Sequence, residues 1–346
     1  MELIVSAAEE SQVFAVDEVR AVLGAAARVR PLGRGVLGVE TGLGAREAAA
    51  RMRHGRSVFV RHQVPVDAIV EVSERPDWVA EVTNAALALL AGEVAPDVPT
   101  GVQIRDVAQL GGAGGAASRR AVLWRHLAGA LPPEVRLEPR HPERVLSVVL
   151  GAGEAWLGLA SVGLHLSAWA GGERHFAHRG EAASRAEYKL REAVESFDVR
   201  LIEGARAVDL GASPGGWTRA LAEAGLQVDA VDPARLDPDV LALRGVRHHR
   251  ERAEVFVARA GAAGHRFDAL VNDMRMDARE AAQLLVGARE VLAAGAWVLT
   301  TLKLPKDGFR ARLAEARTIL AGAFEIVALR QLFHNRSEVT ALLRPR

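Results

Sequence analysis

Lysine is rare in this sequence. Of its 44 lysine and arginine residues, only Lys189, Lys303 and Lys306 are lysine, and the other 41 are arginine. Arginine keeps its proton near neutral pH, whereas the surroundings of a lysine can lower its pKa until the amine is neutral. We therefore expect lysine to stand where an ammonium group or an amine is needed for chemistry. Chance placement is the alternative.

Two of the three lysines fall near acidic residues in the expected sheet. Lys303 ends an apolar strand and Asp273 ends the preceding one. Glu338 lies in a C-terminal hairpin, and Lys189 lies on a helix that leads into the same region. In a doubly wound sheet, the carboxyl ends of neighbouring strands meet at the edge where ligands bind. We expect two ammonium and two carboxylate groups to converge there; a structural salt-bridge network is the alternative.

A glycine-rich turn separates a strand from a helix at Gly211-Ala-Ser-Pro-Gly-Gly-Trp217. Glycines let backbone N–H groups and a helix N-terminus approach a ligand closely. The spacing is neither the dinucleotide fingerprint nor a P-loop. Asp232 ends the next strand, where an acid can bind the ribose hydroxyls of a nucleoside. These features predict a site for an adenosine group; a generic turn with a surface aspartate is the alternative.

Short apolar strands alternate with helices after Glu181, which predicts a parallel, doubly wound sheet. The expected strands are 205–210, 227–231, 269–272, 296–302, 325–332 and 338–343, and the expected helices are 217–224, 253–260, 278–293 and 309–321. The last two strands are too close in sequence for a crossover helix, so they should form an antiparallel hairpin.

This pattern resembles the Rossmann-like fold of S-adenosylmethionine-dependent methyltransferases, a seven-stranded, mostly parallel α/β sheet with a terminal antiparallel strand. The resemblance implies S-adenosylmethionine as the cofactor. It also implies an acid near the adenine after the third strand, where this chain has Arg252. The adenine contact is therefore left open.

The acceptor atom follows by exclusion. Enzymes that methylate an exocyclic amine typically carry Asn/Asp-Pro-Pro-aromatic where this chain reads Asn272-Asp273-Met274-Arg275, and those that methylate a pyrimidine carbon use a cysteine, which is absent. An oxygen remains. A ribose 2′-hydroxyl needs a base or orienting hydrogen bonds. Desolvation and a second ammonium lower the pKa of Lys303 while Asp273 and Glu338 raise it, so Lys303 could act as a neutral base or as a charged orienting group.

The residues before 180 predict two smaller α+β domains. Residues 1–72 follow the ferredoxin-like order β-α-β-β-α-β. The expected strands there are 3–7, 27–32, 36–40 and 58–70, and the expected helices are 17–23 and 45–53. The second domain, 73–179, has expected helices at 78–90 and 118–130, strands at 102–107, 145–150 and 154–161, and a glycine-rich loop at 111–115. Residues 180–346 form the third domain.

Four separated motifs occur in an order that resembles the FtsJ-like ribose 2′-O-methyltransferases, over about residues 182–346. They are Ser184-Arg185-Ala186 to Lys189, Asp209 to Trp217, Asp273 with Leu302-Lys303, and Ser337-Glu338-Val339-Thr340. The resemblance implies that Lys303 is the principal catalytic residue and that Lys189, Asp273 and Glu338 complete a Lys-Asp-Lys-Glu tetrad. It implies that the cofactor is bound by Ser184, Gly211, Pro214, Gly215, Gly216, Trp217, Asp232 and Asp273.

Within this family, the chain is most similar to long members of the RlmM type, which methylate a cytidine ribose in 23S ribosomal RNA and carry a ferredoxin-like unit and a THUMP domain. The resemblance implies a THUMP-like domain at 73–179 and structured RNA, first of all 23S ribosomal RNA, as the partner. Candidate phosphate contacts are Arg51, Arg53, Arg56, Arg119 and Arg120. Solvated surface charge is the alternative for them. Transfer RNA or another RNA as substrate, and an inactive RNA-binding assembly factor, are the competing functions.

Composition limits the remaining possibilities. The 346 residues are 49% hydrophobic and 25% charged, as in folded proteins, and the formal net charge is +1, so RNA binding must come from local clusters. The absence of cysteine excludes disulfides, thiolate zinc sites and cysteine nucleophiles. No secretory signal or membrane span is apparent, so we expect a cytoplasmic protein without membrane association. The scattered histidines predict no metal site, and His248 and His249 are expected to face solvent.

Overall fold

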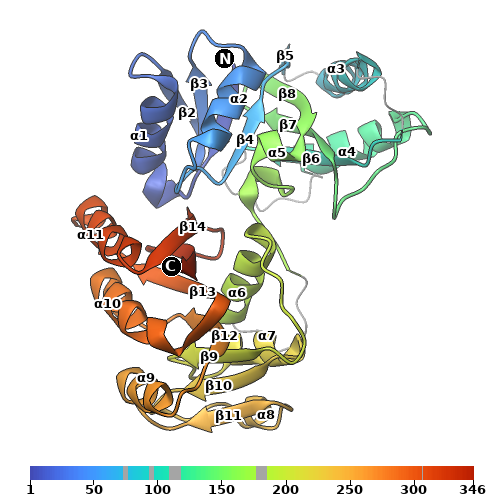
Figure 1. Cartoon of the computed structure of the whole chain (residues 1–346). Coiled ribbons are helices and arrows are strands. Elements are labelled where there is room, and N and C mark those ends of the chain that lie inside the picture. Colours follow the sequence, from blue (N-terminus) through green and yellow to red (C-terminus); the bar gives the residue numbers. More distant parts are fainter. Residues whose placement is uncertain (73–76, 93–96, 109–117, 177–184, 306) are drawn as a thin grey trace. The chain divides into compact units, whose positions relative to one another are not determined.

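The computed structural model describes residues 1–72, 77–92, 97–108, 118–176, 185–305 and 307–346 (Figure 1). Its internal contacts divide the chain into two units, Met1–Arg174 and His175–Arg346, and each has its own hydrophobic core. Three features named from the sequence lie outside the described residues: the glycine-rich loop at 111–115, Ser184 and Lys306.

The first sheet of Met1–Arg174 follows the chain order β-α-β-β-α-β that the sequence predicts. Its strands are β1 (Leu3–Ser6), β2 (Arg28–Gly33), β3 (Val36–Glu40) and β4 (His62–Pro65), in the order β2-β3-β1-β4, with antiparallel neighbours throughout. Helices α1 (Gln12–Leu23) and α2 (Ala45–His54) lie side by side (Figure 1). They bury Val19 and Met52, because apolar residues recur along one face of each helix.

The second sheet of this unit has the order β5-β8-β7-β6. Its strands are β5 (Ala68–Glu71), β6 (Thr100–Asp106), β7 (Arg144–Leu150) and β8 (Glu154–Ser161). Helices α3 (Trp78–Gly92) and α4 (Arg119–Ala130) pack together and contribute Val82 and Leu123 to the core, and the short helix α5 (Val162–His165) follows β8. The helices and strands match the predicted ones closely, because their apolar periodicity is strong.

The strand predicted over 58–70 is instead two strands in different sheets. β4 ends at Pro65, which has no N–H to continue a ladder. The N–H of Asp67 then donates to the carbonyl of Leu157 over 2.8 Å, and its carboxylate accepts from the N–H of Leu159 over 2.8 Å. The chain therefore enters the second sheet before residue 72. The division into domains at 1–72 and 73–179 stays a prediction.

In the described part of His175–Arg346, seven strands form one sheet in the order β11-β10-β9-β12-β13-β15-β14. They are β9 (Arg206–Leu210), β10 (Gln227–Val231), β11 (Val246–His249), β12 (Phe267–Asn272), β13 (Leu292–Lys303), β14 (Phe324–Arg330) and β15 (Glu338–Pro345). The pairs from β11 to β13 are parallel, and β15 is antiparallel to both of its neighbours. The predicted mostly parallel sheet is confirmed.

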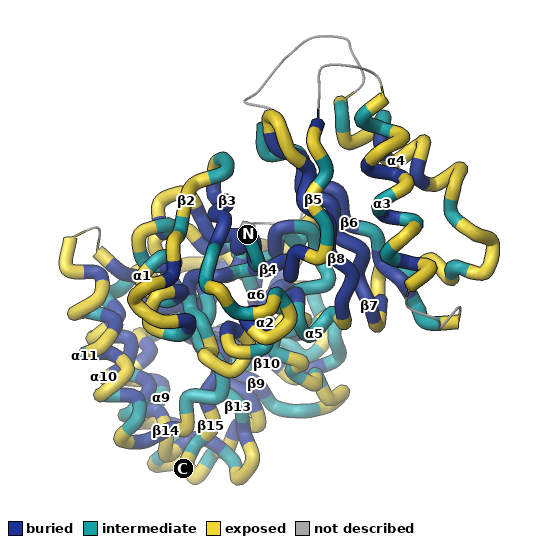
Figure 2. The backbone as a smooth tube through the Cα atoms, turned by 90° about the horizontal axis from the view of Figure 1, so that it is seen from above, coloured by how far each residue is buried: buried dark blue, intermediate teal, exposed yellow. Residues whose placement is uncertain are grey.

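Helices surround this sheet. They are α6 (Arg185–Ser196), α7 (Gly216–Glu223), α8 (Pro238–Leu241), α9 (Ala253–Ala262), α10 (Ala278–Ala288) and α11 (Phe309–Ala321). Ala207, Val271 and Leu299 of the central strands are fully buried with Leu190 of α6. Residues 207–210 of β9 and residues 298–302 of β13 are buried, whereas α10 and α11 have exposed sides (Figure 2). Strands covered on both faces must be apolar throughout, which explains why the sequence shows them as short apolar runs.

The C-terminal hairpin positions one end of the site. β14 and β15 are antiparallel, as their short separation predicts, and β15 inserts between β14 and β13. The register then pairs Lys303, the last residue of β13, with Glu338, the first residue of β15. The two residues are 35 positions apart in sequence but directly opposite in the sheet.

Candidate active site

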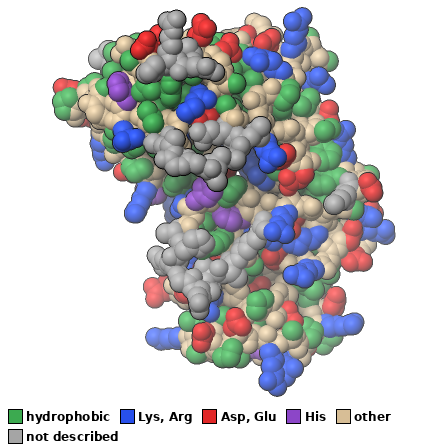
Figure 3. Space-filling view, turned by 180° about the vertical axis from the view of Figure 1, so that it is seen from behind, with side chains coloured by type: hydrophobic (Ala, Val, Ile, Leu, Met, Phe, Trp, Pro, Cys, Tyr) green, Lys and Arg blue, Asp and Glu red, His purple; other side chains and the backbone are tan. Residues whose placement is uncertain are grey.

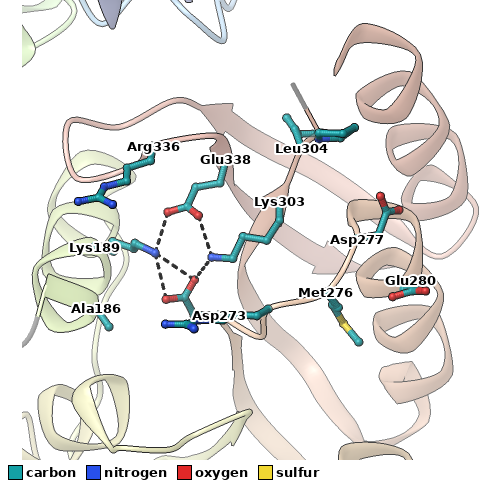
Figure 4. A pocket seen from close by; sticks show the side chains of 12 residues that line it. Ala186, Lys189, Asp273, Met276, Asp277, Glu280, Lys303, Leu304, Arg336 and Glu338 are labelled. Carbon is teal, nitrogen blue, oxygen red and sulfur yellow. Dashed lines mark hydrogen bonds and ion pairs between the residues drawn. The ribbon is translucent and has the colours of Figure 1, made fainter. Parts of the chain in front are cut away.

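The four residues singled out by their charge meet at one edge of the sheet. Lys303 and Glu338 face each other across the β13–β15 pair. Asp273 follows the end of β12, which is the other neighbour of β13. Lys189 projects from α6. Figure 4 shows all four side chains pointing toward one another.

Each ammonium group contacts both carboxylates. Lys189 Nζ lies 2.7 Å from Glu338 Oε1 and 3.2 Å from Asp273 Oδ2. Lys303 Nζ lies 2.5 Å from Asp273 Oδ1 and 2.9 Å from Glu338 Oε2. The exposed fraction of these side chains ranges from 9% for Glu338 to 22% for Lys303. Lys303 is therefore the tetrad member that a ligand in solution reaches most readily.

Thr301 joins this cluster, although the sequence analysis did not single it out. Its hydroxyl accepts from Lys303 Nζ over 2.9 Å and donates to Asp273 Oδ1 over 2.6 Å. An ammonium group has three N–H donors, and Lys303 has three acceptors in Asp273, Glu338 and Thr301. Residues two apart on a strand share a face, so the position of Thr301 relative to Lys303 was the available signal.

Burial and opposite charges compete in setting the pKa values of the tetrad. Burial lowers the pKa of Lys303, but the charges of Asp273 and Glu338 outweigh it and leave this pKa above its usual value. Burial raises the pKa values of Asp273 and Glu338, but Lys303 and Lys189 bring both below their usual values. At neutral pH Lys303 is therefore an ammonium, and both carboxyl groups are ionised.

The glycine-rich turn between β9 and α7 has a backbone that only glycine adopts easily. Gly211 has a φ of 77° and Gly215 a φ of 122°. A Cβ atom on Gly211 would collide with the side chain of Met274, and one on Gly215 would lie 2.8 Å from Val240. Both glycines are thus required by the close approach of chain segments, which agrees with the predicted ligand-binding turn.

Asp232 and Trp217 hold this turn in place. The carboxylate of Asp232 accepts from the N–H of Ser213 over 3.1 Å and from that of Ala234 over 2.8 Å. Each carboxylate oxygen keeps a further lone pair for a ligand hydroxyl. Trp217 is 3% exposed, and its Nε1 donates to the carbonyl of Ala186 over 2.7 Å. Trp217 therefore ties the start of α7 to α6, the helix that carries Lys189.

Two cavities adjoin at Asp273. One, of about 560 Å³, is lined by residues that include Gly211, Pro214, Gly216, Trp217, Asp232 and Asp273. The other, of about 830 Å³, is lined by the tetrad, and the two cavities share Ala186, Asp273 and Arg275. The backbone of the turn at Gly211, with a carboxylate for ribose hydroxyls at Asp232, fits the adenosine part of S-adenosylmethionine.

Asp209 is a buried acid that lines the 560 Å³ cavity, and the sequence analysis assigned it no role. It is 2% exposed, and its carboxyl group accepts from the hydroxyl of Thr218 over 2.6 Å. Burial raises its pKa to about 7, the Thr218 hydrogen bonds oppose this rise, and the charges of Asp273 and Asp232 add to it. The sequence signals for this were a carboxyl group inside an apolar strand and its place at the start of the Asp209 to Trp217 motif.

The expected adenine-contacting position is occupied by Arg252, which lines the 560 Å³ cavity with Glu254. Arg252 directly precedes α9, and Glu254 lies in the first turn of this helix. Both side chains are exposed. The structure thus adds Glu254, two residues further along, as an acid on the same cavity wall.

Glu192 fixes the hairpin turn that precedes Glu338. Its carboxylate accepts from the backbone N–H of Phe333 over 2.7 Å and of His334 over 2.8 Å, and it lies 2.7 Å from Nδ1 of His334. Glu192 is 3% exposed and follows Lys189 by three residues on α6. Residues three apart share a helix face, so this spacing was a signal that sequence reasoning missed.

The arginines proposed as phosphate contacts differ in their surroundings. Arg51, Arg53, Arg56 and Arg120 are exposed, and Arg51 pairs with Glu47 at 2.7 Å. Arg119 is partly buried and lies 3.7 Å from Asp106. Figure 3 shows basic side chains interspersed with acidic ones over the face in view. A role of these arginines in RNA binding stays a prediction.

The expectation that His248 and His249 face solvent is wrong. Both are partly buried on β11, where His249 Nε2 lies 2.7 Å from Asp229 Oδ1 and His248 Nε2 lies 3.1 Å from the carbonyl of Asp232. Among the described residues, no group of three or more His, Asp or Glu side chains is arranged to hold a metal ion. The described helices include none that is long and apolar enough to cross a membrane.

Residues 182–322 match the protein family described as FtsJ-like methyltransferase. This part of the chain is therefore similar to that family. The match includes Lys189, the glycine-rich turn, Asp273 and Lys303, and Glu338 lies just beyond it. The resemblance inferred from the motifs is therefore confirmed over residues 182–322.

Curated relatives carry the name Ribosomal RNA large subunit methyltransferase M. One from Cellvibrio japonicus is 33% identical over 62% of this chain and 63% of the relative, and one from Azotobacter vinelandii is 36% identical over 60% of each. The chain thus spans less than two thirds of the length of these relatives. The solved structure of TrmN from Thermus thermophilus is 17% identical over 100% of both chains, with a TM-score of 0.39, which is too low to establish a common arrangement.

Proposed function

We propose that this protein transfers a methyl group from S-adenosylmethionine to a ribose 2′-hydroxyl of structured RNA, with Lys303, Lys189, Asp273 and Glu338 as the catalytic tetrad. One observation carries the proposal: two lysines and two carboxylates pair with one another at 2.5–3.2 Å where a nucleoside-sized cavity adjoins a second cavity. This arrangement lets a methyl donor and an acceptor oxygen meet at Asp273.

The donor half of the site is the 560 Å³ cavity. Gly211, Pro214 and Gly216 supply its backbone wall, and Asp232 supplies a carboxylate for the ribose hydroxyls of the cofactor. S-adenosylmethionine supplies an electrophilic methyl group on a sulfonium ion. Gly215 packs closely against Val240, and the hydrogen bond from Trp217 to Ala186 connects the start of α7 to α6. Ser184 is included in the proposal from the family resemblance.

Lys303 is the residue that acts on the acceptor hydroxyl. In the resting protein it is an ammonium whose three donors are taken by Asp273, Glu338 and Thr301. A ribose hydroxyl that binds Lys303 must replace one of these acceptors. Lys303 can then orient the lone pair of the hydroxyl oxygen, and it can take the proton only after it has lost its own. The raised pKa of Lys303 favours the orienting role at the start of the reaction.

The substrate is proposed from the relatives. Their name specifies ribosomal RNA of the large subunit, and the RlmM type methylates a cytidine ribose, so a cytidine of 23S ribosomal RNA is the first candidate. A cytoplasmic location follows from such a substrate. The ferredoxin-like and THUMP-like parts of Met1–Arg174 are proposed to bind the structured RNA, through Arg53, Arg56 and Arg120 among others.

Radiolabelled methyl transfer tests this function. The full chain is incubated with labelled S-adenosylmethionine and purified, unmodified 23S or 16S ribosomal RNA or transfer RNA, and the labelled nucleotide is mapped after nuclease digestion. We expect label on a 2′-oxygen of 23S RNA. Label on a base would contradict the tetrad chemistry. Label on transfer RNA alone would show that transfer RNA, and not 23S RNA, is the substrate. Calorimetric titration without cofactor binding would instead favour an inactive assembly factor.

A further inference from the structure

The tetrad by itself does not attract RNA. Lys189 and Lys303 contribute two positive charges, and Asp273 and Glu338 contribute two negative charges that pair with them directly. A closely paired, neutral cluster has little net attraction for a phosphodiester chain. Since nucleic-acid affinity comes mainly from cations that neutralise phosphates, other groups around the acceptor cavity must hold the RNA backbone there.

Two arginines of the acceptor cavity are available for this. Arg275 and Arg336 both line the 830 Å³ cavity, and both side chains are exposed. Among the residues that the structure describes, no carboxylate lies within 4.0 Å of either guanidinium group. The acid Asp277 on the same cavity is already engaged, because Arg312 lies 3.1 Å from it.

Positive and negative side chains lie on opposite sides of this cavity. Figure 4 shows Arg336 beside Lys189, whereas Asp277 and Glu280 lie on the opposite side of the tetrad. A phosphate near Glu280 would meet like charge, and one near Arg336 would meet opposite charge. The electrostatics therefore favour passage of an RNA backbone along the side of Lys189 and Arg336.

The backbone of Arg336 is held while its side chain stays exposed. The carbonyl of Arg336 accepts from Gln331 Nε2 over 2.9 Å. The preceding residue, Asn335, is 3% exposed, and its Oδ1 accepts from the N–H of Leu332 over 2.8 Å and from the hydroxyl of Thr340 over 3.0 Å. The turn thus presents the guanidinium of Arg336 from a fixed base, which reduces the entropy lost on binding.

We propose that Arg336, assisted by Arg275, binds the phosphodiester next to the acceptor ribose. The carbon that bears a 2′-hydroxyl adjoins the carbon that bears the 3′-phosphate, so a 2′-oxygen at Lys303 brings that phosphate to the rim of the cavity. A guanidinium binds phosphate oxygens through two parallel hydrogen bonds. This inference rests on the proposed function and adds the side from which the RNA enters.

The test compares Arg336→Gln with Arg317→Gln in the full chain. Arg317 is an exposed arginine on α11 that does not line the acceptor cavity, so both variants lose one positive charge from the same unit. Binding of an unmodified 23S RNA transcript is measured between 50 and 200 mM salt, with methyl transfer and cofactor titration in parallel. For Arg336→Gln we expect KM for RNA to rise by about five- to tenfold and the salt slope to fall by about one.

The controls separate this inference from the proposed function. Arg317→Gln should change KM for RNA by less than about twofold, as for a surface charge remote from the contact. Arg336→Lys should recover the salt slope but only part of the KM, because an ammonium lacks the two-pronged contact. An active wild type in which Arg336→Gln behaves like Arg317→Gln would overturn this inference alone. A wild type that binds cofactor but methylates no RNA would overturn the proposed function.

Discussion

The glycine-rich turn and the tetrad lie next to each other but are specified in opposite ways. Gly211 to Trp217 form one continuous segment whose local backbone shapes the donor cavity. The tetrad takes its members from α6, β13, β15 and the residue that follows β12, and its geometry depends on side chains that meet only in the folded sheet. One half of the site is therefore local in sequence, and the other half is a product of the topology.

Replacing Lys303 should have the largest effect on methyl transfer. It should leave cofactor binding in the other half of the site nearly unchanged. We expect Lys303→Ala to lower methyl transfer by about 10²- to 10⁴-fold, the usual contribution of a group that acts on the transferred proton. Cofactor affinity in a calorimetric titration should stay within about twofold, because Lys303 does not line the donor cavity.

A second substitution distinguishes the two roles of Lys303. Lys303→Arg keeps the charge but cannot release its proton near neutral pH. Turnover recovered by arginine supports an orienting cation, and turnover lost in both variants supports a proton acceptor. Wild-type turnover in Lys303→Ala contradicts the assignment of the tetrad.

The buried Asp209 lines the donor cavity and offers a test of the structure at that half of the site. Its pKa is raised from 3.8 to about 7, so the folded protein binds this proton more tightly than the unfolded chain does. The stability that it contributes is present below about pH 4 and is lost as the pH rises through about 7. One pKa unit corresponds to about 1.4 kcal/mol, so the loss amounts to a few kcal/mol.

Asp209→Asn removes this titration while keeping an acceptor for Thr218. We measure the free energy of unfolding by urea denaturation. From pH 5 to pH 8, we expect the value for the variant to increase relative to the value for the wild type. Equal pH dependence in the two proteins would show that Asp209 titrates normally.

A substitution in the glycine-rich turn should lower cofactor affinity, which Lys303→Ala should leave nearly unchanged. Gly211→Ala places a Cβ at a φ of 77° against Met274, so it should distort the donor cavity. The cost of a left-handed conformation, about 1–2 kcal/mol, predicts a loss of cofactor affinity of about tenfold or more. Gly225→Ala is the matched control, since Gly225 has a φ of 88° but does not line the cavity. Equal cofactor affinity in both variants would argue against the turn as the donor site.

A substitution of Glu192 tests an indirect effect on the tetrad, because Glu192 binds the turn that precedes Glu338. Glu192→Gln keeps the shape but loses the charge that holds the turn at Phe333 and His334. We expect kcat to fall several-fold with little change in cofactor affinity, since hydrogen bonds to a charged group contribute about 1.5–3 kcal/mol. An unchanged kcat with a lowered melting temperature would limit Glu192 to a structural role.

The fold was predictable where periodicity was strong. Strands β9, β10, β12 and β13 are apolar runs, and their alternation with helices correctly predicted a mostly parallel sheet. β11, which reads Val246-Arg-His-His249, was not among the predicted strands because it has no apolar run. The prediction of one strand over 58–70 was wrong, because the apolar alternation continues through Pro65 while the chain passes from one sheet to the other. Apolar pattern reports burial, but it does not report which sheet a strand joins.

The sequence by itself determined which residues we propose for the chemistry: the rarity of lysine pointed to Lys189 and Lys303, and the glycines and Asp232 predicted a ligand-binding turn. Only the tertiary structure decided how they interact. Insertion of β15 beside β13 brings Glu338 opposite Lys303, and Thr301, Glu192 and Arg336 gain their roles from that placement. The charge of Lys303 was undecided in the sequence because it depends on distances to two carboxylates. Electrostatic energies vary steeply with separation and burial, and both are fixed only when the chain has folded.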